Sequence, residues 1–249
     1  SLGYADCPDH NLPDSTGVGP LPFNNIDGVR ISTALGYLPH ARHRLNLTIR
    51  PETLVHRVVI ENGRAIGVVA ESGGEMFEVR AGQVIVSAGA VVSPQLLMLS
   101  GVGPAEHLEE HGIGVIADVP GVGQNLQDHP MLFLLWNTVP EYEFRLDLKR
   151  LQLSLRYTST DSPDRNDMIV YMNSASTVTG GNRFDPTGIS AHLVLNSADS
   201  RGDIRLESTD IADQPIIDFN YMDASRDLDR MRDGVRRLVQ VGDHPEFQQ

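Results

Sequence analysis

The sequence predicts an α/β protein: part of a doubly wound domain that carries a β-meander, followed by an antiparallel β-sheet of α+β type. Three observations favour this fold class. A continuously apolar run at 84–86 leads through small residues into a helix start. Before it, period-two segments are joined by turn residues, and after residue 131 strand-length apolar runs recur between polar stretches. The length of 249 residues allows one large domain or two ordinary ones.

The chain opens with a loop and a short helix. Prolines and glycines interrupt any periodicity over residues 1–28, so this stretch is expected to be irregular. Ile31, Ala34 and Leu38 then recur at helical spacing, and Pro39 is expected to end the helix.

The period then changes to two, which predicts strands. Four segments alternate in this way: 45–49, 54–60, 65–69 and 76–79. Asn62-Gly63 is the strongest short hairpin signal in the chain, because both turn residues tolerate a positive φ. A second turn at 72–74 completes a small β-meander.

The stretch 84–99 differs from the meander. Residues 84–86 are expected to form a buried parallel strand, and Ser93 and Pro94 are expected to be the N-cap and first residue of a helix over 95–99. The small residues at 87–90 let a ligand approach the backbone, and the helix N-terminus favours an anionic group. This is the outline of a phosphate or dinucleotide site, although αβ units also use small turns only for packing.

A second helix begins at Pro104, points Leu108 inward and ends at Gly112. A short strand at 113–119 and a turn at 120–123 follow. Further strands are expected at 131–136, 151–157, 168–172, 191–195 and 203–206. The polar stretch 161–167 is expected to be a mobile loop. Apolar residues recur at helical spacing over 224–241 and predict an amphipathic helix.

Composition limits the partners and the compartment. With 20 basic and 33 acidic residues the net charge is −13, which repels phosphate backbones and anionic membranes, so no nucleic-acid partner is expected. Cys7 is the only cysteine, which excludes an intrachain disulfide and fits a cytoplasmic setting. No apolar run approaches the length of a membrane span. A start at Ser1, without methionine or a leader, suggests a fragment.

Familiar catalytic motifs are incomplete. His107-Leu108-Glu109-Glu110-His111 has the H-x-x-E-H form of a zinc-peptidase helix, but the helix is short and charged, and we interpret it as a surface helix without metal. The sequence has no G-x-S-x-G motif, no Walker loop and no G-x-G-x-x-G fingerprint. A complete nucleotide site is therefore not encoded, and only a supporting part of one is expected.

Several longer blocks together carry a family resemblance. They are GVRISTA (28–34), RLNL (44–47), GAVVSPQLLMLSGVGP (89–104), VPGVGQNLQDHP (119–130), SRG (200–202) and DFNY (218–221). In order and spacing they resemble the glucose–methanol–choline (GMC) oxidoreductases, flavoenzymes that oxidise alcohols. The resemblance covers nearly the whole chain, although the family's glycine-rich Rossmann turn and its terminal histidine pair are both missing.

The resemblance implies FAD as cofactor and an alcohol as small-molecule substrate, as in alcohol and choline dehydrogenases. Residues 1–130 are then a partial FAD-binding domain, 131–222 a substrate-binding sheet, and 223–249 a helix returning toward the FAD domain. Ser87, Ala88, Gly89 and Ser93 are expected to lie near the adenosine and pyrophosphate, and Val55 to pair its backbone with the adenine. An ordinary buried strand residue is the alternative for Val55.

No catalytic residue is expected in this chain. His244 precedes the family's catalytic region, and His129 is interpreted as structural. Asn125 and Asp128 either hold a flavin-side loop or stabilise a turn. Three readings stay open: an alcohol oxidoreductase that is inactive as the isolated chain, a lyase on the same flavin scaffold, and a non-catalytic piece. Such a piece is stabilised by the missing halves of its own chain or by a homo-oligomer.

Overall fold

The computed structural model describes residues 3–145, 147, 149–176 and 187–247. It divides by compactness into two units, each built from segments distant in the sequence. Unit 1 comprises Ser1–Ile31, Asp128–Ser200 and Tyr221–Gln249, and unit 2 comprises Ser32–Gln127 and Arg201–Asn220. The predicted functional boundaries at 130 and 222 stay predictions.

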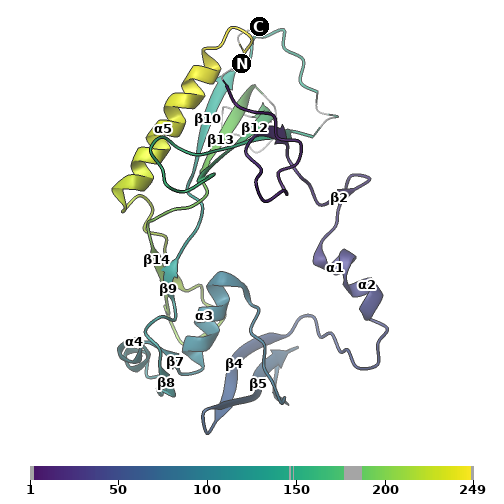
Figure 1. Cartoon of the computed structure of the whole chain (residues 1–249). Coiled ribbons are helices and arrows are strands. Elements are labelled where there is room, and N and C mark those ends of the chain that lie inside the picture. The colour runs from purple at the N-terminus through teal and green to yellow at the C-terminus, as the bar shows by residue number, and fades with distance from the viewer. Residues whose placement is uncertain (1–2, 146, 148, 177–186, 248–249) are drawn as a thin grey trace. The chain divides into compact units, whose positions relative to one another are not determined.

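Unit 1 is built on a five-stranded antiparallel sheet (Figure 1). In spatial order its strands are β1 (Gly17–Pro20), β11 (Leu151–Tyr157), β12 (Met168–Ser176), β13 (Gly188–Leu195) and β10 (Met131–Asn137). The four longer strands confirm the sequence prediction, and β12 and β13 extend beyond it. β1 lies in a stretch predicted to be loop, because its glycines and proline conceal a short edge strand. A two-stranded hairpin, β2 (Asn25–Ile26) and β3 (Val29–Arg30), also lies in this unit.

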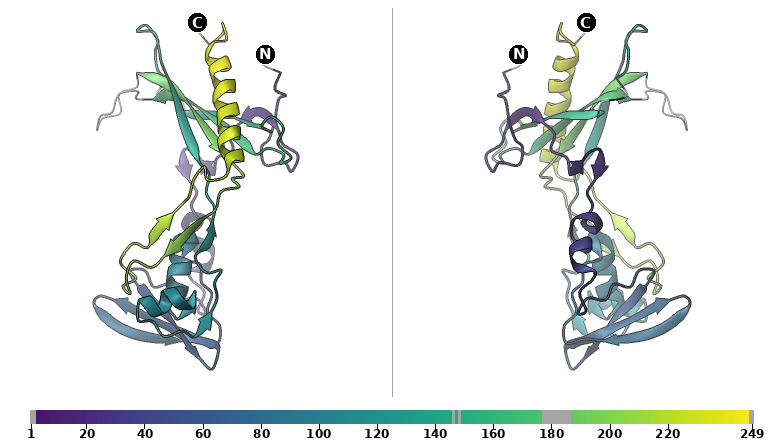
Figure 2. Two further views of the ribbon diagram at one scale, coloured as in Figure 1. Left: turned by 90° about the vertical axis from the view of Figure 1, so that its left-hand side faces the viewer. Right: turned by 90° about the vertical axis from the view of Figure 1, so that its right-hand side faces the viewer.

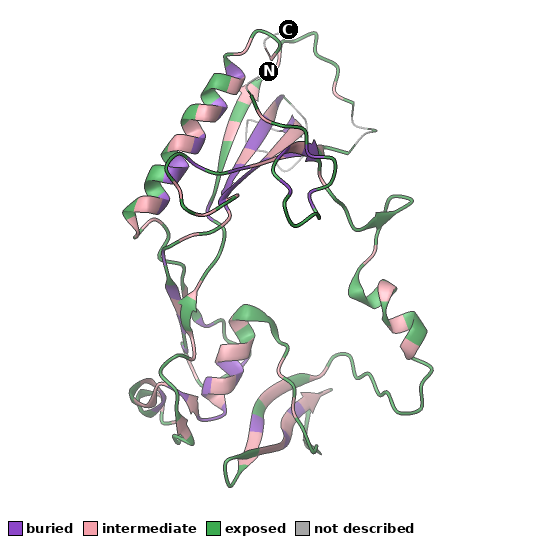
Figure 3. Cartoon of the chain, in the orientation of Figure 1, coloured by how far each residue is buried: buried purple, intermediate pink, exposed green. Residues whose placement is uncertain are grey.

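One face of this sheet is covered by helix α5 (Ser225–Gly242), as both views in Figure 2 show. The helix confirms the prediction for 224–241. Side chains from alternate strand positions, including Val170 and Leu193, pack with Met231 and Leu238 of α5 to form the core. Buried positions gather where helix and sheet meet (Figure 3). No helix in the described part of the chain is long and apolar enough to cross a membrane.

The stretch 161–167 is a polar loop, as the sequence suggested, and its mobility stays a prediction. Asp167 is fully buried, and its carboxylate accepts the Ser159 N–H at 2.8 Å and the Ser159 hydroxyl at 2.7 Å. Arg230 of α5 approaches the same carboxylate at 3.4 Å. The buried Asp167 carboxylate therefore ties the end of this loop to the helix.

Unit 2 contains the predicted β-meander. Its strands are β4 (Leu54–Glu61), β5 (Arg64–Ser72) and β6 (Glu75–Arg80), all antiparallel. Asn62 and Gly63 have φ values of 51° and 75°, as the hairpin turn requires. The predicted strand at 45–49 is wrong: these residues form no strand, and Leu45 is exposed.

Helix α3 (Gly89–Leu99) follows the meander and corrects two predictions. The helix begins five residues earlier than expected, so Ala88 is the N-cap, Ser93 caps nothing, and Pro94 lies inside the helix. Residues 84–86 are not in any strand, and Ile85 is 78% exposed. A parallel strand needs a partner from elsewhere in the sequence, and no described segment pairs with this one.

The remaining elements of unit 2 are short. They are α1 (Thr33–Gly36), α2 (Leu38–Ala41), β7 (Val102–Gly103), α4 (Ala105–Glu110), β8 (Ala117–Asp118), β9 (Gln124–Leu126), β14 (Gly202–Arg205) and β15 (Ile216–Asp218). Pro39 does not end a helix but occupies the first turn of α2, where its missing N–H costs nothing. Helix α4 confirms the second predicted helix, and Leu108 is fully buried. Of the strand predicted at 113–119, only β8 forms, and it pairs in parallel with β7.

Candidate functional site

A cavity of about 480 Å³ lies in unit 2 between α3, the loop before β9, and β14. Ala90, Ser93, Pro94 and Leu97 of α3 form one wall. Residues 121–127 and Ile204 form the other. The first of these walls belongs to the GAVVSPQLL block, and residues 121–127 of the second belong to the VPGVGQNLQDHP block. Two sequence blocks that each resemble a family motif therefore meet at one cavity.

The second wall depends on close backbone contact. Gly123 has a φ of +83°, and a Cβ at this position would lie 2.2 Å from the Ile204 carbonyl oxygen. The Ile204 N–H donates to the Gly123 carbonyl at 2.7 Å, which fixes the loop against β14. Asn125 also has a positive φ, of 61°. A side chain at Gly123 would push this wall away from β14, so the glycine is required by packing.

The bend before α3 is open. Ser87, Ala88, Gly89 and Ala90 are all exposed, and a Cβ built on Gly89 would meet nothing within 4 Å. Gly89 has a φ of +87°, which suits glycine and strains other residues. Ala88 supplies no side-chain hydrogen bond as N-cap. The N–H groups of the first helical turn therefore face outward without a cap, and together with the helix dipole they favour a negative charge.

Val55 lies on β4, at the edge of the three-stranded sheet, and is half-buried. An edge strand presents N–H and C=O groups that are not used inside the sheet. Helix α3 packs against β4, and Ser100 connects them: its hydroxyl accepts the Val58 N–H at 2.8 Å and donates to the Leu96 carbonyl at 2.6 Å. Of the five predicted cofactor residues, only Ser93 lines the cavity itself.

Asp128 makes two hydrogen bonds of the kind that stabilise a turn, and its role beside the flavin stays a prediction. Its carboxylate accepts the His129 N–H at 2.8 Å and the Tyr221 hydroxyl at 2.6 Å. Burial and the bond to Asp128 raise the pKa of Tyr221 to about 12. The bond from Tyr221 also lowers the pKa of the Asp128 carboxyl.

His107 of the H-x-x-E-H segment makes a structural hydrogen bond. Its Nε2 accepts the Leu206 N–H at 2.9 Å, and the carbonyl oxygen of His107 lies 3.0 Å from His111 Nδ1. Burial, and then the neighbouring His111, lower the pKa of His107. Among the described residues no group of three or more His, Cys, Asp or Glu could hold a metal ion.

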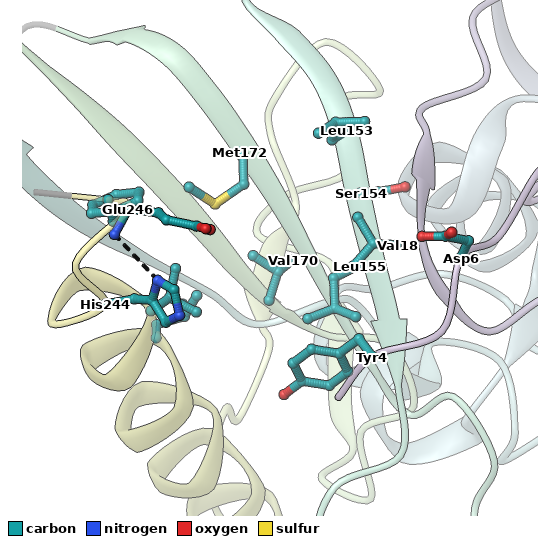
Figure 4. Close-up of a pocket in the computed structure, with 13 residues that line it drawn as sticks. Tyr4, Asp6, Val18, Leu153, Ser154, Leu155, Val170, Met172, His244 and Glu246 are labelled. Carbon is teal, nitrogen blue, oxygen red and sulfur yellow. Dashed lines mark hydrogen bonds between the residues drawn. The ribbon is translucent and has the colours of Figure 1, made fainter. Parts of the chain in front are cut away.

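Unit 1 has a cavity of its own, of about 470 Å³, on the α5 side of the sheet (Figure 4). Its lining is mainly aliphatic, with Leu155, Val170 and Met172 from the sheet. His244 lies at one end, and its Nδ1 accepts the Glu246 N–H at 3.3 Å. This histidine thus lies in an apolar setting behind the sheet.

Comparison with known proteins identifies the class. The GMC oxidoreductase family matches residues 1–131 with its N-terminal part and residues 198–249 with its C-terminal part. A GMC-type oxidoreductase of Rhodococcus erythropolis is 38% identical over 234 residues, covering 94% of this chain and 46% of the relative. An oxygen-dependent choline dehydrogenase of Photobacterium profundum is 34% identical over 263 residues, covering 96% and 46%.

Solved structures agree on the fold. The pyridoxine 4-oxidase from Mesorbium loti has a TM-score of 0.86 and 28% identity, covering 98% of this chain and 49% of that one. A formate oxidase has a TM-score of 0.85 and 20% identity, covering 100% and 52%. The chain spans about half the length of the curated relatives it matches.

The chain has the fold of the GMC oxidoreductases, and the predicted α/β fold class is confirmed. The chain belongs to the GMC oxidoreductase family. Membership in this family supports FAD as the cofactor. The residues present fit that group, because the bare main chain at 87–90, open at Gly89, and the uncapped α3 N-terminus suit a pyrophosphate.

Proposed function

We propose that this chain is the flavin-holding and alcohol-binding portion of an FAD-dependent GMC-type enzyme that oxidises an alcohol. The open bend at 87–90, at the uncapped start of α3, is the observation that supports it most directly. The adjoining cavity, lined by both family blocks, offers space for part of the FAD molecule.

Each predicted residue then has a task. Ser87, Ala88 and Gly89 leave the main chain bare for the pyrophosphate, and the first-turn N–H groups of α3 stabilise its charge. Ser93 borders the cavity, and Val55 lies on an edge strand whose outward backbone groups suit an adenine. FAD held at the 87–90 bend and the start of α3 would supply the redox chemistry, with flavin N5 as the hydride acceptor for the alcohol carbon. The hydroxyl proton goes to a base that we assign to no residue of this chain.

Titration of the chain with FAD, followed by flavin fluorescence, tests the binding role. Gly89→Ala is expected to weaken FAD binding about tenfold, because holding a non-glycine residue at positive φ costs roughly 1–2 kcal/mol. Gly82→Ala is the matched control, since Gly82 also has open space around its Cβ but no positive φ. Equal loss in both variants, or no FAD binding by the parent chain, contradicts the proposal.

The chemistry needs a separate test. The isolated chain with FAD, an alcohol and an artificial electron acceptor is expected to show no turnover, because no base is assigned to it. Turnover under these conditions would overturn the expectation. Anaerobic bleaching of the flavin by alcohol in the intact enzyme separates an oxidoreductase from a lyase, which performs no net oxidation.

A further inference from the structure

The five-stranded sheet of unit 1 has one face packed under α5 and a second face that α5 leaves free. Strand register defines the free face, because directly paired residues point to the same side. Tyr171 of β12, His192 of β13 and Phe133 of β10 are direct neighbours in one row across it. Phe133 is 58% exposed, and Tyr171 and His192 are half-buried. The centre of the sheet thus presents three rings side by side.

These rings are held in place by their neighbours. Phe133 and His192 pack edge to face, with ring centroids 4.6 Å apart and an interplanar angle of 69°. His192 Nε2 lies 3.3 Å from the Ser190 hydroxyl, which is 2.6 Å from that of Ser176. His192 Nδ1 has no hydrogen-bond partner within the described residues. Burial lowers the pKa of His192, so its ring is neutral at pH 7.

The charge of the face is equally informative. None of the five strands contains an Asp or Glu. Among Asp, Glu, Lys and Arg residues, these strands contain only Arg156. Arg156 lies on the same face as Tyr171, one row away. Its guanidinium donates to the Ser15 hydroxyl at 2.9 Å and to the His10 carbonyl at 3.3 Å, so the N-terminal loop covers this side of the face. The strands therefore offer a cationic ligand no carboxylate and one fixed positive charge.

We infer that the row of Tyr171, His192 and Phe133 binds the substrate as an uncharged alcohol bearing a flat ring, in preference to a quaternary-ammonium alcohol. This inference rests on the proposed function. Aromatic side chains pack well against flat apolar groups, and the free Nδ1 of His192 offers one polar contact. A flat row also lacks the enclosing arrangement with which aromatic residues hold an ammonium group.

An NMR titration of the chain with benzyl alcohol and with choline chloride, at matched ionic strength, tests the inference. Benzyl alcohol is expected to shift resonances of Tyr171, His192 and Phe133, and to bind about tenfold more tightly than choline. Equal or tighter binding of choline at these residues overturns the inference, as does the absence of shifts with both alcohols. FAD titration of the same sample reports the proposed function separately.

Two variants refine the test. Phe133→Ala is expected to weaken benzyl alcohol binding about fivefold through loss of ring contact. Leu153→Ala is its control, because Leu153 is similarly exposed, at 48%, but lies on the α5 side of the sheet. An equal effect of both substitutions contradicts a binding face at Phe133.

A gain of function addresses the charge argument. Asn173→Asp adds a carboxylate one row from His192 and is expected to strengthen choline binding about threefold. Gln240→Glu adds the same charge on an exposed position of α5 and is expected to change nothing. If both variants raise choline binding equally, the effect is one of net charge and the inference is wrong.

Discussion

Asp227 is fully buried at the start of α5, and every contact of its carboxylate is a charge-assisted bond. Oδ1 accepts the Asp199 N–H at 2.9 Å and lies 2.5 Å from the Arg230 guanidinium. Oδ2 accepts both the N–H of Ser200, at 2.8 Å, and its hydroxyl, at 2.6 Å. Burial by itself raises the pKa of Asp227, but these hydrogen bonds outweigh it, and the pKa lies below its ordinary value.

Asp227→Asn is expected to cost about 3 kcal/mol of unfolding free energy in unit 1, because it leaves the buried Arg230 with too little negative charge. Asp223→Asn is the matched control, since Asp223 lies four residues earlier and is exposed. Urea denaturation followed by tryptophan fluorescence measures both variants. A loss below about 0.5 kcal/mol for Asp227→Asn would show that the cluster is not stabilising.

The same carboxylate makes stability depend on pH. Since the folded pKa lies below the ordinary value of 3.8, the stabilisation is complete above that value and is lost as the pH falls further. Asp167 adds a second contribution of the same sign, because hydrogen bonds from Ser159 outweigh the effect of its burial on its pKa. The acid loss of stability is therefore expected to be shallower, but not absent, in Asp227→Asn. An unchanged slope between about pH 2 and 4 would contradict this.

Helix α4 is tied to the segment after β14 by the bond from the Leu206 N–H to His107 Nε2. A proton on Nε2 abolishes that bond. Because the folded pKa of His107 is lowered from 6.5, by burial first and His111 second, its stabilisation is complete above 6.5 and declines as pH falls. The Leu206 amide is expected to lose hydrogen-exchange protection, relative to the global value, when pH drops from about 7.5 to 5.5.

His107→Gln separates this effect from other titrations, because an amide oxygen accepts a hydrogen bond at all these pH values. The Leu206 amide should then keep the same relative protection at both pH values. His40→Gln, at an exposed position in α2, serves as the control and should leave the pH effect intact. If His40→Gln also removes it, the effect does not originate at α4.

Element by element, local signals predicted what local interactions determine. The Asn62-Gly63 hairpin and the apolar stripe of α5 both formed as expected, since a turn and an amphipathic helix are set by neighbouring residues. The strand at 84–86 did not form, because its pairing depends on a segment distant in sequence. The start of α3 was misplaced for a related reason: Ser93-Pro94 is a strong local cap signal, yet the chain turns at Gly89.

The candidate site shows the same limit. The small residues at 87–90 can be recognised in the sequence. Their exposure depends on the path of the backbone, which only the structure shows. The opposing wall at 121–127 belonged to a motif, but its contact with Ile204 depends on the Gly123 backbone lying against β14. Val55 was placed on a strand correctly, and its task in adenine recognition stays a prediction.

On the scale of the whole molecule, the two units have separate cores of different size. The core of unit 1 extends across the sheet and α5, whereas the buried cluster of unit 2 consists of Met98, Leu108 and Leu206. Unit 2 is therefore expected to unfold at a lower urea concentration. Trp136, the only tryptophan, packs against Phe247 in unit 1 with ring centroids 5.3 Å apart. Its fluorescence reports unit 1, whereas far-UV circular dichroism reports both units.

The two signals should consequently give transitions that do not coincide, with circular dichroism changing first. Leu108→Ala should lower only the first midpoint and Leu193→Ala only the second, because the two side chains are fully buried in different cores. Each substitution is expected to reduce the unfolding free energy of its unit by about 2–5 kcal/mol. FAD should raise the first midpoint alone, since a ligand stabilises the unit that binds it. Superimposable transitions, or midpoints that shift together in both variants, would mean that the chain unfolds as one cooperative body and that the two cores depend on each other.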